Sequence, residues 1–185
     1  MRATGIVRRI DELGRIVIPI EIRRNMNIRE GDPLEIFVDR EGEVILKKYS
    51  ALAEMVDVCR AAAEALWEST GEVVMITDRD EVIAVAGAGP REFQGKKIGP
   101  VVLQAMDERQ VLVFTSYYHR HPGGLLGQEV EKCQFGSEVI VPVISAGDPL
   151  GAVIVASREG GRDLGETERK LAEATAGFLA RHMEE

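Results

Sequence analysis

The spacing of apolar residues at the start of the chain is that of a β-hairpin. Residues 6–10 are typical of a short strand, in which successive side chains point to opposite faces. Residues 11–14 have the composition of a turn, and Gly14 can supply a positive φ there. The β-branched run 16–18 predicts a second short strand. We therefore expect a strand, a turn and a strand before residue 19.

A short helix and a second hairpin follow. Pro19 suits the first turn of a helix, where its missing N–H costs little, and residues 20–24 continue that helix. The Gly- and Pro-containing segment 29–33 ends it. Residues 34–48 contain two strand-like runs around a turn at 39–42. The predicted order is β-β-α-β-β.

The helical period returns after Ser50, which is a favourable N-cap residue. Apolar residues then recur at spacings of three and four from Leu52 to Leu66. The pattern predicts an amphipathic helix that runs to about Ser69 and ends at Thr70-Gly71. We expect residues 51–70 to link an N-terminal domain, residues 1–50, to a C-terminal domain, residues 71–185.

The C-terminal domain has the pattern of an α+β fold, with helices flanking an antiparallel sheet. A Gly-rich loop is expected at 86–90 and a polar loop at 117–134. Strands are expected at 72–77, 81–86, 111–116, 138–145 and 150–157, and a short helix at 100–108. Ala146-Gly147-Asp148-Pro149 should form the turn of the last hairpin.

A last helix is predicted near the C-terminus. Asp163 and Glu166 have the spacing of a capping box at its start. Its buried face is expected to carry Leu171, Thr175, Phe178 and Leu179.

Charge is distributed unevenly along the chain. The net charge is −8, which by itself is unfavourable for nucleic-acid binding. Residues 1–30, however, hold seven Arg and four acidic residues, which gives 7 − 4 = +3, and residues 51–185 hold 13 basic and 22 acidic residues, which gives 13 − 22 = −9. A local basic surface is what phosphate binding requires.

Composition excludes several other classes of protein. No apolar run approaches the roughly 20 residues that span a bilayer, and the N-terminus lacks the apolar segment of a signal peptide. Two cysteines, Cys59 and Cys133, do not make a disulfide framework and favour a cytoplasmic location.

The arginines of the N-terminal segment are the strongest candidates for a binding function. The guanidinium fork matches both phosphate oxygens and guanine edges. Strand alternation turns Arg9 away from Arg8, so Arg9 ranks lower, and Arg2 is an additional candidate for a phosphate contact. Glu21 either orients one of the arginines or faces water.

The string TGIVRRIDELGRIVIPIEIRR, from Thr4 to Arg24, resembles the DNA-binding domain of AbrB-type transition-state regulators of spore-forming bacteria. The resemblance continues with few gaps through GDPLEI to LKKY, at residues 46–49. It implies a swapped-hairpin β-barrel in which two chains interlock, a role as a nucleoid-associated regulator of sporulation genes, and DNA contacts from the arginines that match the family pattern. Those arginines are Arg8, Arg15, Arg23 and Arg24.

The free-energy balance of this segment also favours a dimer. Ordering about 50 residues costs roughly 75 kcal/mol. The apolar area that a chain of this size buries, about 2,700 Å², contributes roughly 70 kcal/mol. Because the sum is near zero, stability should come from a partner chain.

Residues 139–157, VIVPVISAGDPLGAVIVAS, are similar to the closing hairpin of GAF domains. This resemblance implies a regulatory or small-molecule-sensing domain without a defined ligand, and a domain that only assembles the protein ranks just behind it. The apolar stripes of helices 51–69 and 164–183 could pair between chains and build a homotetramer from two dimers.

We find no catalytic, metal-binding or cofactor motif, and we expect no enzyme. His119 and His121 lack further ligands at a metal-site spacing, and Ala86-Gly87-Ala88-Gly89-Pro90 lacks the Lys and Ser/Thr of a phosphate loop. Cys59 lies on an apolar stripe, and Cys133 is a candidate exposed thiol; some GAF-fold enzymes reduce methionine sulfoxide, but they need several cysteines.

Two rival functions remain open. Swapped-hairpin domains also occur in antitoxins, but there a short tail, not a folded domain, typically follows the barrel. Alternatively, the N-terminal segment could serve only for dimerisation of a small-molecule sensor.

Overall fold

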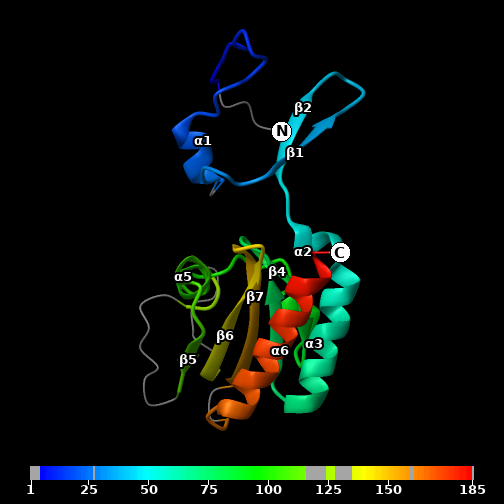
Figure 1. The fold of residues 1–185 in the computed structure, drawn as a ribbon, viewed down its shortest axis with the longest axis vertical. Helices are drawn as coiled ribbons and strands as arrows, with labels where there is room; N and C mark the ends of the chain where they lie inside the picture. The colour runs from blue at the N-terminus through cyan, green and yellow to red at the C-terminus, as the bar shows by residue number, and fades with distance from the viewer. Residues whose placement is uncertain (1–4, 27, 116–123, 128–134, 159–160, 185) are drawn as a thin grey trace. The chain divides into compact units, whose positions relative to one another are not determined.

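The computed structural model describes the chain except for residues 1–4, 27, 116–123, 128–134, 159–160 and 185. The chain divides into two compact units, residues 1–49 and residues 50–185 (Figure 1). Each unit has its own sheet. No helix in the described ranges is both long and apolar enough to cross a membrane.

The N-terminal unit contains one helix and one hairpin. Helix α1 spans Ile20–Asn25, with Pro19 at its N-cap position. Strands β1 (Leu34–Val38) and β2 (Val44–Lys48) pair antiparallel. The turn between them is held by Asp39, whose Oδ1 accepts the backbone N–H groups of residues 41 and 43, each at 2.9 Å. The helix and the second hairpin are therefore as the sequence predicts.

The predicted strands at 6–10 and 16–18 are not formed in the single chain. The described residues 5–19 contain a turn but no strand. The turn itself is confirmed, because Gly14 has a φ of +75° and its N–H donates to the Asp11 carbonyl at 2.9 Å. A strand exists only when its backbone groups pair with another strand, and the described residues of this chain supply none for these two segments.

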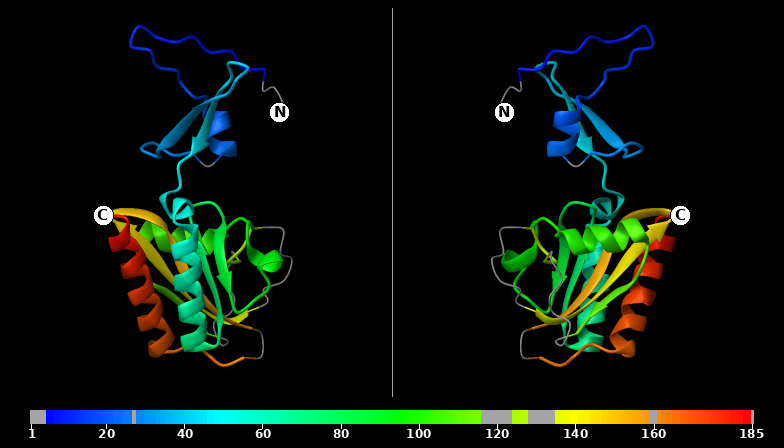
Figure 2. Two further views of the ribbon diagram at one scale, coloured as in Figure 1. Left: turned by 90° about the vertical axis from the view of Figure 1, so that its right-hand side faces the viewer. Right: turned by 90° about the vertical axis from the view of Figure 1, so that its left-hand side faces the viewer.

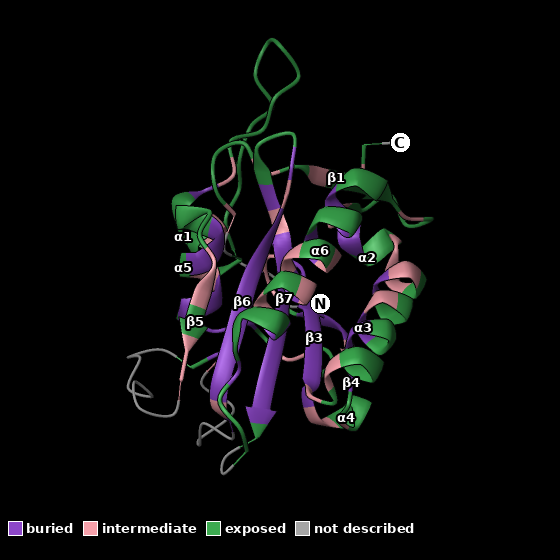
Figure 3. Ribbon diagram, turned by 60° about the horizontal axis from the view of Figure 1, so that its bottom comes forward, coloured by how far each residue is buried: buried purple, intermediate pink, exposed green. Residues whose placement is uncertain are grey.

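The C-terminal unit is built on a five-stranded antiparallel sheet in the order β4-β3-β7-β6-β5. Its central strands are buried along nearly their whole length (Figure 3). The bounds are β3 Val73–Thr77, β4 Val82–Ala86, β5 Leu112–Phe114, β6 Phe135–Ser145 and β7 Asp148–Arg158. The α+β prediction of an antiparallel sheet flanked by helices is confirmed.

Helices cover both faces of this sheet (Figure 2). The bounds are α2 Ala51–Glu54, α3 Val56–Thr70, α4 Pro90–Phe93, α5 Pro100–Glu108 and α6 Glu166–His182. Helices α3 and α6 pack on one face, and α4 and α5 lie on the other. The sequence pattern missed α4, which it assigned in part to a loop.

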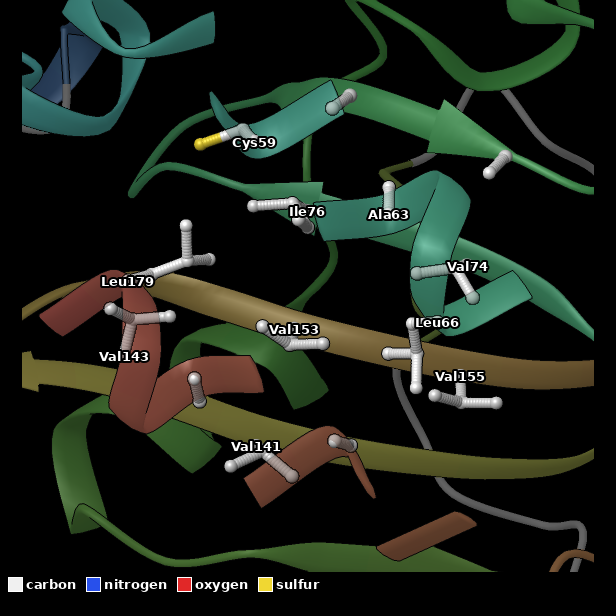
Figure 4. Close-up of a cluster of buried hydrophobic side chains, with 14 of the residues drawn as sticks. Cys59, Ala63, Leu66, Val74, Ile76, Val141, Val143, Val153, Val155 and Leu179 are labelled. Atoms are coloured by element: carbon white, nitrogen blue, oxygen red, sulfur yellow. The ribbon is translucent and has the colours of Figure 1, made fainter. Parts of the chain in front are cut away.

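Strand alternation separates two cores. Val153 and Val155 of β7 face the helices α3 and α6, whereas Ile154 faces α5. Figure 4 shows the first core, which includes Cys59, Ala63, Leu66, Val74, Ile76, Val141, Val143, Val153, Val155 and Leu179. The opposite core includes Met75, Phe93, Val102, Met106, Ile140 and Ile154. Because both faces are covered, these strands are apolar on both sides.

The helix predicted from Ser50 to Ser69 is interrupted at Met55. The N-cap is confirmed, since Ser50 Oγ accepts the N–H of Ala53 at 3.2 Å, and Gly71 ends α3 in the left-handed conformation. Leu52 is fully buried in the core of the C-terminal unit. The helical segment therefore packs as part of that unit.

The hairpin of β6 and β7 turns more tightly than predicted. Ala146 and Gly147 form the turn, with φ values of +49° and +89°. Asp148 and Pro149 already belong to β7. Both strands are 11 residues long. Asp148 pairs with Ser145, so the cross-strand register extends almost to the turn.

Two details of the last helix are corrected. The predicted capping box of Asp163 and Glu166 would start the helix at Asp163. The helix instead begins at Glu166, with Gly165 as its N-cap, and the side chain of Glu168 accepts the N–H of Gly165 at 2.8 Å. Phe178 is 53% exposed, although it was expected on the buried face. Leu179 is buried as predicted, and the small residues Ala172, Ala176 and Ala180 lie on the buried face with it.

Candidate nucleic-acid interface

The first two candidate arginines lie in an extended segment that ends at the turn of residues 11–14. Arg8 and Arg9 are both exposed. Arg8 Nη1 donates to the carbonyl of Val7 at 3.4 Å. Without a formed strand, the single chain gives no basis for placing Arg9 on the face opposite Arg8. Arg2 lies outside the described residues.

Arg15 is tied to the turn by Asp11. Its Nε lies 2.8 Å from Asp11 Oδ2, and its backbone N–H donates to Asp11 Oδ1, also at 2.8 Å. The side chain of Arg15 remains 70% exposed. The backbone N–H of Arg15 and then its guanidinium lower the pKa of Asp11, so this carboxylate is ionised at neutral pH.

Arg23 and Arg24 occupy the last turn of α1. Cations are favourable there because the carbonyl ends of a helix carry partial negative charge. Arg24 is exposed and Arg23 is half-buried. The Nε of Arg23 is buried and makes no hydrogen bond within the described residues. These two arginines therefore differ in surroundings despite their adjacent positions.

The residue that orients an arginine is Asp11, not Glu21. Glu21 is exposed in the first turn of α1, and its carboxylate makes no ion pair within the part of the chain that is described. Asp at the first position of a turn characteristically bonds the backbone two residues onward. That local signal could have identified Asp11 from the sequence.

The apolar side chains that neighbour these arginines in the sequence are unusually exposed to solvent. Val7 is 84% exposed, Leu13 73% and Val17 71%. So many exposed large apolar side chains are unusual in a folded protein and favour an interaction surface. The other exposed apolar residues of the N-terminal unit include Ile6, Ile10, Ile16, Ile20, Met26, Ile36, Phe37, Val38 and Val44.

Comparison with known proteins identifies the family of this chain. Residues 54–184 match the family described as Stage V sporulation protein T C-terminal, transcription factor. The chain is 46% identical over 185 residues to Stage V sporulation protein T of Bacillus subtilis (strain 168), with 100% of both chains covered. This chain belongs to the Stage V sporulation protein T family.

The N-terminal unit has relatives of its own. It is 65% identical over 49 residues to the Transition state regulatory protein AbrB of Bacillus subtilis (strain 168), which is 26% of this chain and 50% of AbrB. Residues 7–53 also match the family described as Antidote-toxin recognition MazE, bacterial antitoxin. The family thus combines an AbrB-type N-terminal unit with its own C-terminal domain.

Two solved structures share the fold of the C-terminal unit. The GAF domain from an Acinetobacter phosphoenolpyruvate-protein phosphotransferase has a TM-score of 0.57 at 15% identity, over 75% of this chain and 84% of that chain. A type II free methionine-R-sulfoxide reductase from Thermoplasma acidophilum has a TM-score of 0.54 at 17% identity, over 72% and 95%. At such low sequence identities the likeness establishes the GAF fold alone and says nothing about activity.

The remaining candidate chemistry is limited. No group of three or more His, Cys, Asp or Glu residues with metal-site geometry occurs among the described residues. His119, His121 and Cys133 lie outside the described residues. Cys59 is fully buried, and burial raises the pKa of its thiol to about 11. The protonated thiol lies 3.6 Å from the Leu52 carbonyl, as expected for a structural residue.

Proposed function

We propose that this protein regulates sporulation genes by binding double-stranded DNA through the arginines of its N-terminal unit. The observation that carries the proposal is the combination of exposed arginines with the AbrB-type sequence that holds them. Arg8, Arg15, Arg23 and Arg24 supply the main contacts, and Arg9 and Arg2 add to them. The protein acts in the cytoplasm, on the nucleoid.

Substitution of single arginines tests this assignment. Arg15→Ala and Arg23→Ala should each weaken binding to a fluorescein-labelled mixed-sequence duplex by at least about tenfold. With about eight contacts per dimer the log–log salt slope should be near −7, and each substitution should reduce its magnitude by about 2 because a dimer loses two contacts. Fluorescence anisotropy over a salt series measures both quantities.

Arg91→Ala is the matched control for charge. Arg91 is an exposed arginine of α4 in the C-terminal unit. Its removal should leave both the affinity and the slope unchanged. If Arg15→Ala and Arg23→Ala behave like Arg91→Ala, the N-terminal arginines do not bind DNA and the proposal is wrong.

A second copy of the chain is the natural occupant of the exposed apolar surface of residues 1–49. The segments 6–10 and 16–18 have strand-forming sequences but no pairing partner among the described residues of one chain. Two interlocked copies would pair these segments and close a swapped-hairpin barrel. The homodimer through residues 1–50 is therefore part of the proposed function.

We also propose that two dimers assemble into a tetramer through α3 and α6, the helices that the sequence predicts at 51–69 and 164–183. Phe178 is half-exposed on α6 and stacks on His182, with 5.9 Å between the ring centres. A depression of about 450 Å³ lies beside them, lined by Glu173, Ala174, Gly177, Phe178, Arg181 and His182. An aromatic side chain from a second copy fits such a feature. Two DNA-binding dimers on one particle would raise avidity without new contacts to DNA.

A small-molecule ligand of the GAF-like unit is the second candidate role, and it is compatible with assembly. Glu138 in β6 is fully buried, and by strand alternation it faces the same side of the sheet as Ile140. Glutamates are seldom fully buried in protein interiors, so Glu138 is a candidate polar contact for a ligand on that side of the sheet. Native mass spectrometry of freshly purified protein tests both roles. A tetramer without added mass supports assembly alone, and a stoichiometric added mass supports a ligand.

The antitoxin-type match of residues 7–53 supports one alternative, a module that binds a small partner protein. The folded C-terminal unit counts against it. Stoichiometric co-purification of such a partner, together with DNA binding that is indifferent to the arginine substitutions, would establish this alternative.

A further inference from the structure

The turn that carries Arg15 is organised by a single carboxylate. Asp11 Oδ1 accepts two backbone N–H groups, from Leu13 at 2.9 Å and from Arg15 at 2.8 Å. The backbone closes the same turn, because the N–H of Asp11 donates to the carbonyl of Arg15 at 3.0 Å. Gly14 takes the left-handed conformation that the turn requires, with a φ of +75°. The turn is thus fixed without help from the rest of the unit.

The second oxygen of this carboxylate fixes the side chain of Arg15. Asp11 Oδ2 accepts from Arg15 Nε at 2.8 Å, the length of a charge-assisted hydrogen bond. A guanidinium group has further donors on its two terminal nitrogens. Engaging Nε therefore restrains the long side chain while its terminal fork stays available to a ligand, in keeping with the 70% exposure of Arg15.

Placing a carboxylate at this position is unfavourable for DNA binding on charge alone. A negative charge beside the proposed contacts repels phosphate groups. Asp11 is 41% exposed, and Arg15 keeps its pKa below the usual range, so the charge is present at neutral pH. The unfavourable charge needs a compensating benefit, and the restraint of Arg15 supplies one.

We infer that Asp11 is a positioning residue for DNA recognition, which holds the guanidinium of Arg15 in the orientation that meets the nucleic acid. The inference rests on the proposed function, since Arg15 must first be a DNA contact. A restrained arginine loses less rotamer freedom on binding than a free one. Asp11 thereby strengthens binding despite its sign of charge.

The test uses the fact that the positioning role and the charge of Asp11 predict opposite effects on DNA affinity. Asp11→Asn keeps an oxygen that can accept the backbone N–H groups of the turn, but it removes the ion pair with Arg15. Restoring side-chain freedom should weaken binding to the labelled duplex by about threefold to tenfold. Pure electrostatics predicts the opposite, tighter binding, because one negative charge is gone.

Glu12→Gln is the matched control. Glu12 is the next residue, is exposed and has no ion pair within the described residues, so the substitution makes the same change of charge without touching Arg15. It should leave the affinity unchanged or raise it. Native mass spectrometry and thermal unfolding of both variants should match the unsubstituted protein, which shows that the turn and the assembly persist.

A double-mutant cycle completes the experiment. In an Arg15→Ala background, Asp11→Asn should no longer weaken binding, because no guanidinium remains to be positioned. Equal weakening by Asp11→Asn in both backgrounds would overturn the inference, and so would tighter binding in both. If Arg15→Ala itself binds like the unsubstituted protein, the proposed function fails at this residue. If Arg15→Ala is weak and Asp11→Asn is not, only the positioning role fails.

Discussion

The two units of this protein treat their apolar residues in opposite ways. In the C-terminal unit, Val153 and Ile154 are each fully buried, on opposite faces of one strand. In the N-terminal unit, Val17 is 71% exposed and no residue of α1 is buried. Similar local sequences thus give a complete core in one unit and an open apolar surface in the other. A unit that cannot bury its apolar residues within one chain is built for association.

This comparison identifies where each unit obtains its stability. The C-terminal unit covers both faces of its sheet with its own helices. The described residues of the N-terminal unit form only a two-stranded sheet and a six-residue helix. An isolated hairpin is marginally stable in water. Substitutions should therefore destabilise folding in the first case and association in the second.

The largest effect is expected at the buried face of α6. Leu179 is fully buried, so Leu179→Ala should lower the free energy of unfolding by about 2–5 kcal/mol through lost burial and a residual cavity. Phe178→Ala is the neighbouring control and should cost less than about 1 kcal/mol in a single chain, because Phe178 is half-exposed. Urea unfolding measures both. A cost for Phe178→Ala that appears only at high protein concentration would point to the proposed tetramer.

A charge on the open apolar surface should come next in size. Val17→Asp lies on an exposed position of the single chain, where a surface substitution changes stability by less than about 0.5 kcal/mol. If a second copy covers Val17, the buried unpaired charge should weaken dimerisation by about 3 kcal/mol, or roughly a hundredfold. Analytical ultracentrifugation across a dilution series reports the dimer constant. Val113→Asp, at an exposed position of β5, should leave it unchanged.

The smallest of these effects is a pH dependence confined to the C-terminal unit. Burial raises the pKa of Cys59 from 9.0 to about 11, so the folded state holds the thiol proton more tightly than the unfolded chain. Stability should be intact below pH 9.0 and fall by about 2–3 kcal/mol as the pH rises toward 11. Cys59→Ala should lose this part of the decline. Identical pH profiles for the two proteins between these values would contradict the burial effect.

Local signals in the sequence predicted much of the structure. Gly14, Gly42 and Gly71 all adopt the positive φ that their turns or helix ends require. Ser50 caps the helix that it was expected to cap. Helix α5 and most strands of the C-terminal unit lie within a few residues of their predicted bounds. These features depend on a few neighbouring residues, which is why the sequence reveals them.

Long-range packing explains the features that the sequence did not reveal. The helix after Ser50 breaks at Met55, where Leu52 enters the core near Gly151 of β7. A Cβ at Gly151 would lie 1.9 Å from the backbone oxygen of Thr77 and 2.7 Å from Leu52 Cδ1, so the close approach of the Thr77 backbone requires glycine here, and Leu52 packs against the same position. No local pattern around Met55 encodes the position of β7.

The candidate site also has some features that are set by local sequence and others that are set by long-range packing. The sequence alone determined which residues carry positive charge, where the turns lie and which segments are able to form strands, because these properties are set by side-chain chemistry and by short-range φ/ψ preferences. Asp11, not Glu21, holds an arginine through the local geometry of its turn, a contact between near neighbours in the sequence. Tertiary structure decided that Phe178 faces outward and that residues 6–10 and 16–18 lack a strand partner within the described part of one chain. Burial and strand pairing depend on which distant surfaces meet, and a linear pattern does not specify that.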